Sequence, residues 1–194
     1  MNTIVLASNN KHKIAEFKQM LNTNIITMKE VGFHDDIIED GKTFFENSMI
    51  KAKAISDFLK NKNLSYDVLA DDSGLCVNAL NGEPGIFSAR YAGDHTSEAN
   101  RQKLLENLKG KNDRTAYFNC TLVLLHPDGS YIEAVGKTYG HILEEKDGDS
   151  EFTYDCLFFS DELGKSFSSA SPEEKNSVSH RGKAIQNLIK KLKN

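Results

Sequence analysis

The sequence predicts an α/β fold: a mixed, twisted β-sheet flanked by helices and containing a long β-hairpin. Helical and strand patterns alternate along its 194 residues, which is typical of α/β proteins and not of β-sandwiches. Two β-rich runs, 115–125 and 131–142, lie on either side of the turn Pro127-Asp128-Gly129 and predict the hairpin. With 39% hydrophobic and 27% charged residues, the chain is globular, and its length predicts a single domain over residues 1–194.

The N-terminal part predicts a strand, a polar turn, a helix and a second strand. The apolar run from Thr3 to Ala7 is typical of a buried strand. Apolar residues then recur at Ile14, Phe17 and Leu21, which is the spacing of one helix face. Residues 25–28 form a second short apolar run, so we expect a strand there.

The next elements are a capped helix and a strand. Thr43 and Glu46 match the capping-box pattern, which predicts a helix to about Leu59 and gives Glu46 a structural role. Residues 68–70 have the pattern of a buried strand, and the pair Ser73-Gly74 predicts a break in that strand.

The C-terminal half predicts three more helical segments. Thr96 is a capping residue for a helix that ends near Leu108, and residues 171–176 open a helical turn. Ser179 is a natural N-cap for the last helix, which extends through 184–192.

Charge and cysteine content exclude several classes of protein. A net charge of −4 and a pI near 5.9 argue against a duplex-DNA partner. The cysteines Cys76, Cys120 and Cys156 are far apart, which is typical of core thiols in a reducing compartment and predicts no structural zinc. The first residues do not have the pattern of a signal peptide, and no run approaches 18 apolar residues. We therefore expect a soluble cytoplasmic protein with no nucleic-acid or membrane partner.

Carboxylates supply the first candidate site. Asp71 and Asp72 follow a buried strand, and both can face one cleft only if the strand breaks after them. Asp72, next to the expected break, is the stronger candidate. Glu39 has no structural role of the kind that Glu46 has, so it is a candidate ligand of a hard cation, although a solvated acidic loop is the commoner outcome for such a residue.

Cationic and polar residues at two helix starts supply a second candidate site. The turn Ser8-Asn9-Asn10-Lys11-His12-Lys13 precedes the first helix, whose free backbone N–H groups and two lysines suit a phosphate. Taken alone, an ordinary N-capped helix with solvated lysines explains this turn as well. His180 and Arg181 fall in the first turn of the last helix, where cations oppose the helix dipole unless an anion or acceptor oxygen compensates them. The segment 152–155 carries two aromatic side chains, which suit either a protein core or a stacked base.

Together these residues predict a nucleotide hydrolase that uses Mg²⁺. Donors bind phosphate, carboxylates bind magnesium, and a carboxylate positions or deprotonates the attacking water. Gly41-Lys42-Thr43 and Gly164-Lys165-Ser166 resemble the end of a P-loop, but both lack the glycine five residues earlier. Metalloprotease, nucleophile-elbow and dinucleotide-binding motifs are also missing from the sequence.

Three blocks of the sequence resemble the inosine triphosphate pyrophosphatase family. They are ASNNKHK, ADDSGLCVNALNGEPGIFSARYAG and EEKNSVSHRGKA, in family order and spacing over essentially the whole chain. The resemblance implies an α/β homodimer with two lobes around a central nucleotide cleft. It also implies a Mg²⁺-dependent enzyme that cleaves purine nucleoside triphosphates (ITP, dITP and XTP) to the monophosphate and pyrophosphate.

The resemblance also implies residue roles. Asp72 would bind the metal and act on water, and Glu39 would be a second metal ligand, with Glu46 close by as the alternative. The implied substrate contacts are Ser8, Asn9, Asn10, Lys11, His12, Lys13, Ser73, Phe152, Thr153, Tyr154, Asp155, Lys175, His180 and Arg181. Two residues depart from the family pattern: Thr153 stands where glycine is usual, and Cys156 where proline is usual.

Two other functions remain open on the sequence. One is a related pyrophosphatase of pyrimidine or modified nucleotides. The other is a regulatory protein that binds a nucleoside triphosphate without cleaving it, although unpaired carboxylates beside phosphate are costly without a metal.

Overall fold

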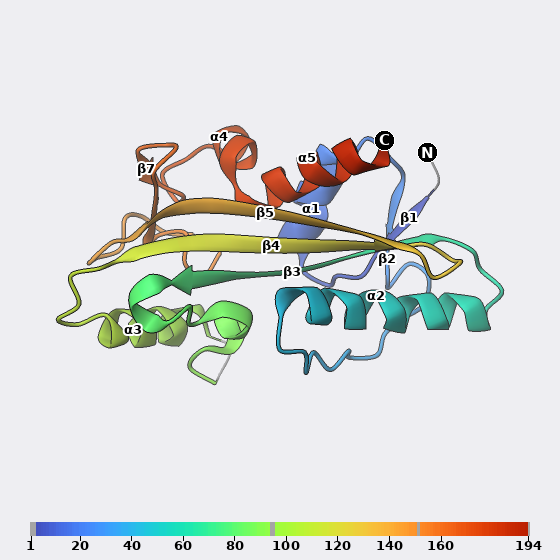
Figure 1. Ribbon diagram of the computed structural model, residues 1–194, viewed down its shortest axis with the longest axis horizontal. Helices are drawn as coiled ribbons and strands as arrows, with labels where there is room; N and C mark the ends of the chain where they lie inside the picture. Colours follow the sequence, from blue (N-terminus) through green and yellow to red (C-terminus); the bar gives the residue numbers. More distant parts are fainter. Residues whose placement is uncertain (1–2, 94–95, 151, 194) are drawn as a thin grey trace. The chain divides into compact units, whose positions relative to one another are not determined.

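The computed structural model describes residues 3–93, 96–150 and 152–193. Its seven strands form one sheet in the order β2-β1-β3-β4-β5-β6-β7 (Figure 1). Strand β1 is parallel to both β2 and β3, whereas β6 is antiparallel to both β5 and β7. The sheet is therefore mixed and flanked by helices, which confirms the predicted fold class.

Strands and helices alternate through most of the chain. The strands are β1 (Ile4–Leu6), β2 (Ile25–Thr27), β3 (Asp67–Val77), β4 (Thr115–Leu125), β5 (Tyr131–Ile142), β6 (Phe158–Ser160) and β7 (Lys165–Ser166). The helices are α1 (Lys11–Met20), α2 (Phe44–Asn61), α3 (Ser97–Asn107), α4 (Pro172–Val178) and α5 (His180–Leu192), with short 3₁₀ segments η1 (Asn78–Leu80) and η2 (Gly85–Arg90). Among these described residues, no helix is long and apolar enough to span a membrane.

The chain divides into two compact units. Unit 1 consists of 1–72, 120–135 and 184–194, and unit 2 of 73–119 and 136–183. Strands β3, β4 and β5 each contribute residues to both units. The single domain expected from the length stays a prediction.

In unit 1, the sheet carries a hydrophobic core on each face. Leu6 of β1 and Leu69 of β3 pack in one cluster with residues of α1 and α5, whereas Val5 and Val68 pack in another with residues of α2. Alternate side chains of a strand point to opposite faces, so neighbouring residues of β1 and β3 enter different cores. Figure 1 shows α1 and α5 on one side of these strands and α2 on the other.

The expected break after Asp72 is wrong, because β3 runs without interruption from Asp67 to Val77. Gly74 instead permits a close approach of η2. A Cβ there would lie 2.2 Å from the carbonyl oxygen of Gly85, and the amide of Leu75 donates a 2.9 Å hydrogen bond to the hydroxyl of Ser88. Glycine inside a strand marks such a contact as readily as it marks a turn.

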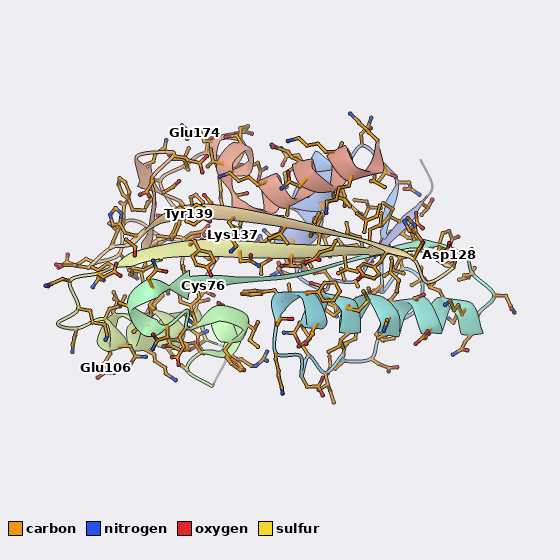
Figure 2. All side chains as sticks on the ribbon, viewed as in Figure 1. Cys76, Glu106, Asp128, Lys137, Tyr139 and Glu174 are labelled. Atoms are coloured by element: carbon orange, nitrogen blue, oxygen red, sulfur yellow. The ribbon has the colours of Figure 1, made fainter. Side chains whose placement is uncertain are left out.

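In unit 2, an aromatic cluster forms the centre of the core. The ring of Phe118 in β4 packs against Phe158 and Phe167, with centroids 4.8 and 6.0 Å away. The exposed side of β5 carries Lys137 and Tyr139 (Figure 2). The core therefore lies on the opposite side of this strand from these two side chains.

Capping residues predicted from the sequence begin the helices as expected. Thr43 accepts a hydrogen bond from the amide of Glu46, and Thr96 accepts one from the amide of Ala99. At α5, the Ser179 hydroxyl accepts a bond from the amide of Gly182. The β4–β5 hairpin is also confirmed, since these two strands are neighbours joined by a five-residue turn, 126–130.

Gly140 of β5 provides a test of the packing between β5 and β6. A Cβ at this position would lie 1.9 Å from the carbonyl oxygen of Phe159. We expect Gly140→Ala to lower the free energy of unfolding by about 1–3 kcal/mol or more, because backbone must move to admit the methyl group. Urea unfolding at neutral pH measures the change.

Val135→Ala, at an exposed position of the same strand, is the control and should change stability by less than about 0.5 kcal/mol. Equal unfolding midpoints for Gly140→Ala and the wild type would contradict this close packing of β5 on β6.

Candidate active site

Asp72 is a buried carboxylate of β3, in unit 1, that faces α2. Its Oδ2 accepts a 3.0 Å hydrogen bond from the side-chain Nδ2 of Asn47, and its Oδ1 lies 4.0 Å from Nζ of Lys51. Asn47 and Lys51 are four residues apart in α2, so they lie on the same face of the helix. The regular geometry of α2 therefore fixes the two groups that contact Asp72.

Lys51 joins Asp72 to Glu39. Its Nζ forms a close ion pair with Oε2 of Glu39, and the Lys51 side chain is only 11% exposed. The ammonium group thus lies against both carboxylates that the sequence assigned to a metal. Sequence reasoning missed Lys51, although its spacing from Asn47 on a capped helix was a usable signal.

Burial raises the pKa of the Asp72 carboxyl above its ordinary value. The positive charge of Lys51, the hydrogen bond from Asn47 and the charge of Lys13 oppose this effect, while the negative charge of Glu39 adds to it. Asp72 is therefore a carboxylate with increased proton affinity, which suits a group that accepts a proton from water.

Gly41 holds the loop that carries Glu39 against α2. Its amide donates a 2.9 Å hydrogen bond to Oδ1 of Asn47, and a Cβ on Gly41 would lie 2.7 Å from that same oxygen. Glu46 accepts a bond from the amide of Lys42 at the start of the helix. Glu46 therefore has a structural role at the helix start, but its bond comes from the amide of Lys42 and not from that of Thr43, as the predicted capping box requires. Glu39 is then the acid paired with Lys51.

Asp71 does not join this group. Because β3 is unbroken, Asp71 points to the opposite face from Asp72 and forms a 2.7 Å ion pair with Lys13 of α1. The expectation that both aspartates face one cleft rested on the break in the strand and fails with it. Asp71 instead fixes the position of a lysine that the sequence assigned to phosphate.

The turn before α1 is organised by Asn10. The Asn10 Oδ1 accepts hydrogen bonds from the amides of His12 and Lys13, at 3.0 and 3.2 Å, and the Ser8 hydroxyl accepts one from the amide of Asn10. These two first-turn amides are therefore occupied and not free as predicted. Of the remaining residues assigned to this turn, Asn9 and Lys11 are exposed.

The pair Glu39 and Asp72 fits Mg²⁺. Magnesium is usually bound in proteins by one or two carboxylates, with water and substrate phosphates completing its shell. A cationic group, the Lys51 ammonium, already lies against both carboxylates. Within the described ranges, no group of three or more His, Cys, Asp or Glu side chains is placed to hold a metal, so the protein offers this pair and not a complete cage.

Unit 2 contains a second set of predicted residues, built around Lys175 of α4. The Lys175 Nζ lies 2.5 Å from Oδ2 of Asp155 and 3.8 Å from the ring centroid of Phe152. Lys175 and Asp155 are both buried. Three of the predicted substrate contacts are therefore brought together by an ion pair and a cation–π contact.

The two residues between Phe152 and Asp155 are held by other elements. The Tyr154 hydroxyl donates a 2.9 Å bond to the carbonyl of Ser88, and burial raises the pKa of that hydroxyl. The Thr153 hydroxyl lies 3.0 Å from that of Ser97 in α3. Tyr154 is thus a core residue, which is the first of the two alternatives, protein core or stacked base, that the sequence left open for the aromatic side chains of this segment.

His180 and Arg181 lie in the first turn of α5, as predicted, and both are buried. The His180 ring stacks on Phe118 with centroids 4.8 Å apart and planes 15° apart. The backbone of Gly182 packs directly against α4, because a Cβ at this position would lie 2.0 Å from the carbonyl oxygen of Asn176. The helix start is therefore fixed by packing on β4 and on α4.

Ser73, which follows Asp72 in β3, is partly exposed.

Comparison with known proteins places this chain in a family. A sequence model described as the Ham1 family matches residues 4–191. A dITP/XTP pyrophosphatase of Clostridium perfringens is 48% identical over 200 residues, which cover 100% of this chain and 98% of that protein. One of Leuconostoc mesenteroides is 44% identical, covering 97% of this chain and 96% of that protein.

Solved structures agree with these matches. The Ham1 protein of Staphylococcus aureus is 41% identical with a TM-score of 0.87, covering 98% of both chains. A HAM1 protein of Coxiella burnetii is 38% identical with a TM-score of 0.88, covering 100% of this chain and 99% of that one. The sequence matches and the shared fold lead to the same conclusion: the chain belongs to the Ham1 family.

Proposed function

We propose that this protein hydrolyses the purine nucleoside triphosphates ITP, dITP and XTP to the monophosphate and pyrophosphate. The structural observation that carries the proposal is the buried Asp72 carboxylate, placed beside Lys51 and Glu39. The names of relatives that match over almost their full length supply the reaction. The enzyme is a hydrolase acting on an acid anhydride.

Residues of the α1 turn form the phosphate end in this proposal. The Lys13 ammonium, held by Asp71, and the polar side chains of residues 8–12 contact the triphosphate. Since Asn10 occupies the amides of His12 and Lys13, the phosphate is bound mainly by side chains. Ser73, the residue that follows Asp72 in β3, is a further substrate contact.

Glu39 and Asp72 are the residues that would hold Mg²⁺. The bound ion would neutralise phosphoryl charge and make the phosphorus more electrophilic. Asp72 accepts a proton from the attacking water at a carboxylate oxygen, a role that its raised proton affinity favours. The water oxygen forms a new bond to the α-phosphorus, the bond to the bridging oxygen breaks, and pyrophosphate leaves.

Residues of unit 2 contact the base. Hypoxanthine and xanthine present a 6-keto acceptor where adenine presents an amino donor. A donor such as the His180 amide or the Arg181 guanidinium would pair with the keto oxygen and would oppose the amino group of ATP. Unpaired buried groups of this kind give discrimination of about 10⁴-fold. The side chains of Phe152 and Lys175, in contact with one another, complete the base-binding set.

The remaining parts of the proposal come from the resemblance, which implies the homodimer, and from the length and composition of the chain. We propose one functional domain over residues 1–194, a homodimer, a cytoplasmic location, and no nucleic-acid or membrane partner. Light scattering of the purified protein measures the oligomeric state directly.

The first test is a turnover panel with Mg²⁺ that compares ITP, dITP, XTP, ATP, GTP, dTTP and UTP. We expect pyrophosphate from ITP, dITP and XTP at rates far above those with ATP and GTP. Separate assays of pyrophosphate and orthophosphate identify the bond that is cleaved. Orthophosphate as the product, or preference for dTTP or UTP, would contradict the proposal; binding of ITP without any turnover would indicate a regulatory nucleotide-binding protein.

Asp72→Asn tests the role of the carboxylate. We expect kcat to fall by about 10²–10⁴-fold, because the amide cannot accept the proton of water, while ITP still binds. Steady-state assays of pyrophosphate release measure kcat, and isothermal titration calorimetry measures the binding of ITP. Asp67→Asn is the matched control, since Asp67 lies on the same strand and contacts His126 instead. Retained turnover in Asp72→Asn rules out the assigned role.

The same variant has a second expected effect, on stability without metal. A carboxyl whose pKa is raised by folding favours the native state most when protonated, so the stability it contributes is lost as the pH rises through the native pKa. At pH 7, with EDTA present, we expect Asp72→Asn to unfold at higher urea concentration than the wild type. The difference should shrink as the pH falls toward the ordinary carboxyl pKa of 3.8. A less stable variant at pH 7 would contradict this prediction, because it would show that the Lys51 charge and the Asn47 hydrogen bond outweigh the cost of burying the ionised carboxylate.

A further inference from the structure

We propose that Arg101 and Ser97 of α3 are positioning residues that hold the segment 152–155 through Thr153 and so set the affinity and selectivity for the base. The proposal rests on the proposed function, because it assumes that this segment contacts the nucleotide base. All residues in it belong to unit 2. Neither α3 residue was among the candidates found in the sequence.

Two separate bonds join α3 to Thr153. The Arg101 Nη1 donates to the Thr153 carbonyl oxygen at 3.1 Å, and the Ser97 and Thr153 hydroxyl oxygens are 3.0 Å apart. The Arg101 side chain is only 13% exposed, and its Nη2 donates to Glu98 at 2.7 Å. The guanidinium is therefore fixed at one end by a carboxylate and contacts the backbone of the segment at the other.

The other residues of the segment are anchored without α3. Tyr154 bonds to the Ser88 carbonyl, Asp155 pairs with Lys175, and both are buried. Phe152 and Thr153 are only partly buried. The Arg101 guanidinium thus holds the peptide group between Thr153 and Tyr154, where the less buried half of the segment meets the buried half.

Thr153 transmits this anchoring to Phe152. The two residues are consecutive, and Thr153 is held at its carbonyl by Arg101 and at its hydroxyl by Ser97, so the backbone to which Phe152 is joined is held on its C-terminal side. The Phe152 amide donates to the Ser150 hydroxyl at 3.1 Å, and the Phe152 ring lies against Lys175. Release of Thr153 would let this ring and its cation–π contact shift, which alters the surface offered to a base.

The contact also accounts for the residue at position 153. Where the family pattern has glycine, this chain has a β-branched hydroxyl residue, and the hydroxyl is used in the bond to Ser97. A glycine would keep the carbonyl bond to Arg101 and lose the hydroxyl bond. The Ser97–Thr153 hydrogen bond is therefore a second contact, independent of Arg101, that holds the same segment.

The test compares Arg101→Met, Arg101→Lys, Ser97→Ala and Thr153→Val with Gln102→Ala. Gln102 is the matched control because it also bonds to Glu98, at 3.2 Å, and lies beside Arg101 in the same helix. We expect Arg101→Met to raise KM for ITP about tenfold with kcat changed less than about twofold, and to lower the preference for ITP over ATP. Arg101→Lys should recover part of the loss.

Ser97→Ala and Thr153→Val remove the same bond, so the double variant should be no worse than the more affected single variant. Additive losses in the double variant would overturn the hydroxyl pair. KM values and ITP preference in Arg101→Met equal to those of Gln102→Ala would overturn the role of Arg101.

Amide hydrogen exchange without nucleotide separates this proposal from the proposed function. We expect faster exchange in the peptide containing residues 152–157 of Arg101→Met, and of Thr153→Val if Arg101→Met does not fold, with Gln102→Ala unchanged. If the wild type hydrolyses no purine triphosphate, the proposed function fails, and the exchange result still decides whether α3 holds the segment. Unchanged exchange in the folded variants overturns the proposal.

Discussion

The unbroken course of β3 is the constraint on which the candidate active site depends. Successive side chains of a strand point to opposite faces, so Asp71 meets Lys13 of α1 while Asp72 meets Asn47 and Lys51 of α2. Two adjacent carboxylates are thereby given different roles by geometry alone. One fixes a lysine through an ion pair, and the other is buried in a setting that raises its proton affinity.

Much of this could be predicted from the sequence, because the signals were local. The strand patterns, the caps Thr43, Thr96 and Ser179, and the β4–β5 hairpin depend on residues close together in the chain. The break in β3 was predicted wrongly, because Ser73-Gly74 has the composition of a turn. Gly74 is needed there for the approach of Gly85, a contact that no local pattern in the sequence reveals.

The site shows the same division. Lys13 and the residues of α5 were found because cationic side chains stand at the starts of helices. Asp72 was found because it was expected at a strand end, although it lies in the middle of β3. Lys51 and Arg101 were missed because each lies within a helix, where lysine and arginine usually face solvent. Their importance comes from partners on other elements, Glu39 and Thr153. For a charged residue within a helix, burial and the partners on other elements therefore indicate a site better than the residue type does.

The assembly of unit 1 from distant stretches has a consequence for synthesis of the chain. Residues of α5, including Ala184, Ile185 and Leu188, share a core with Ile4, Leu6 and Phe17 from the beginning of the chain. Domains generally begin to fold N-terminal first while the ribosome is still translating, but this face of the sheet cannot be covered until α5 has left the exit tunnel. Until then, the apolar side chains of β1 and α1 that pack against α5 lack that part of their core.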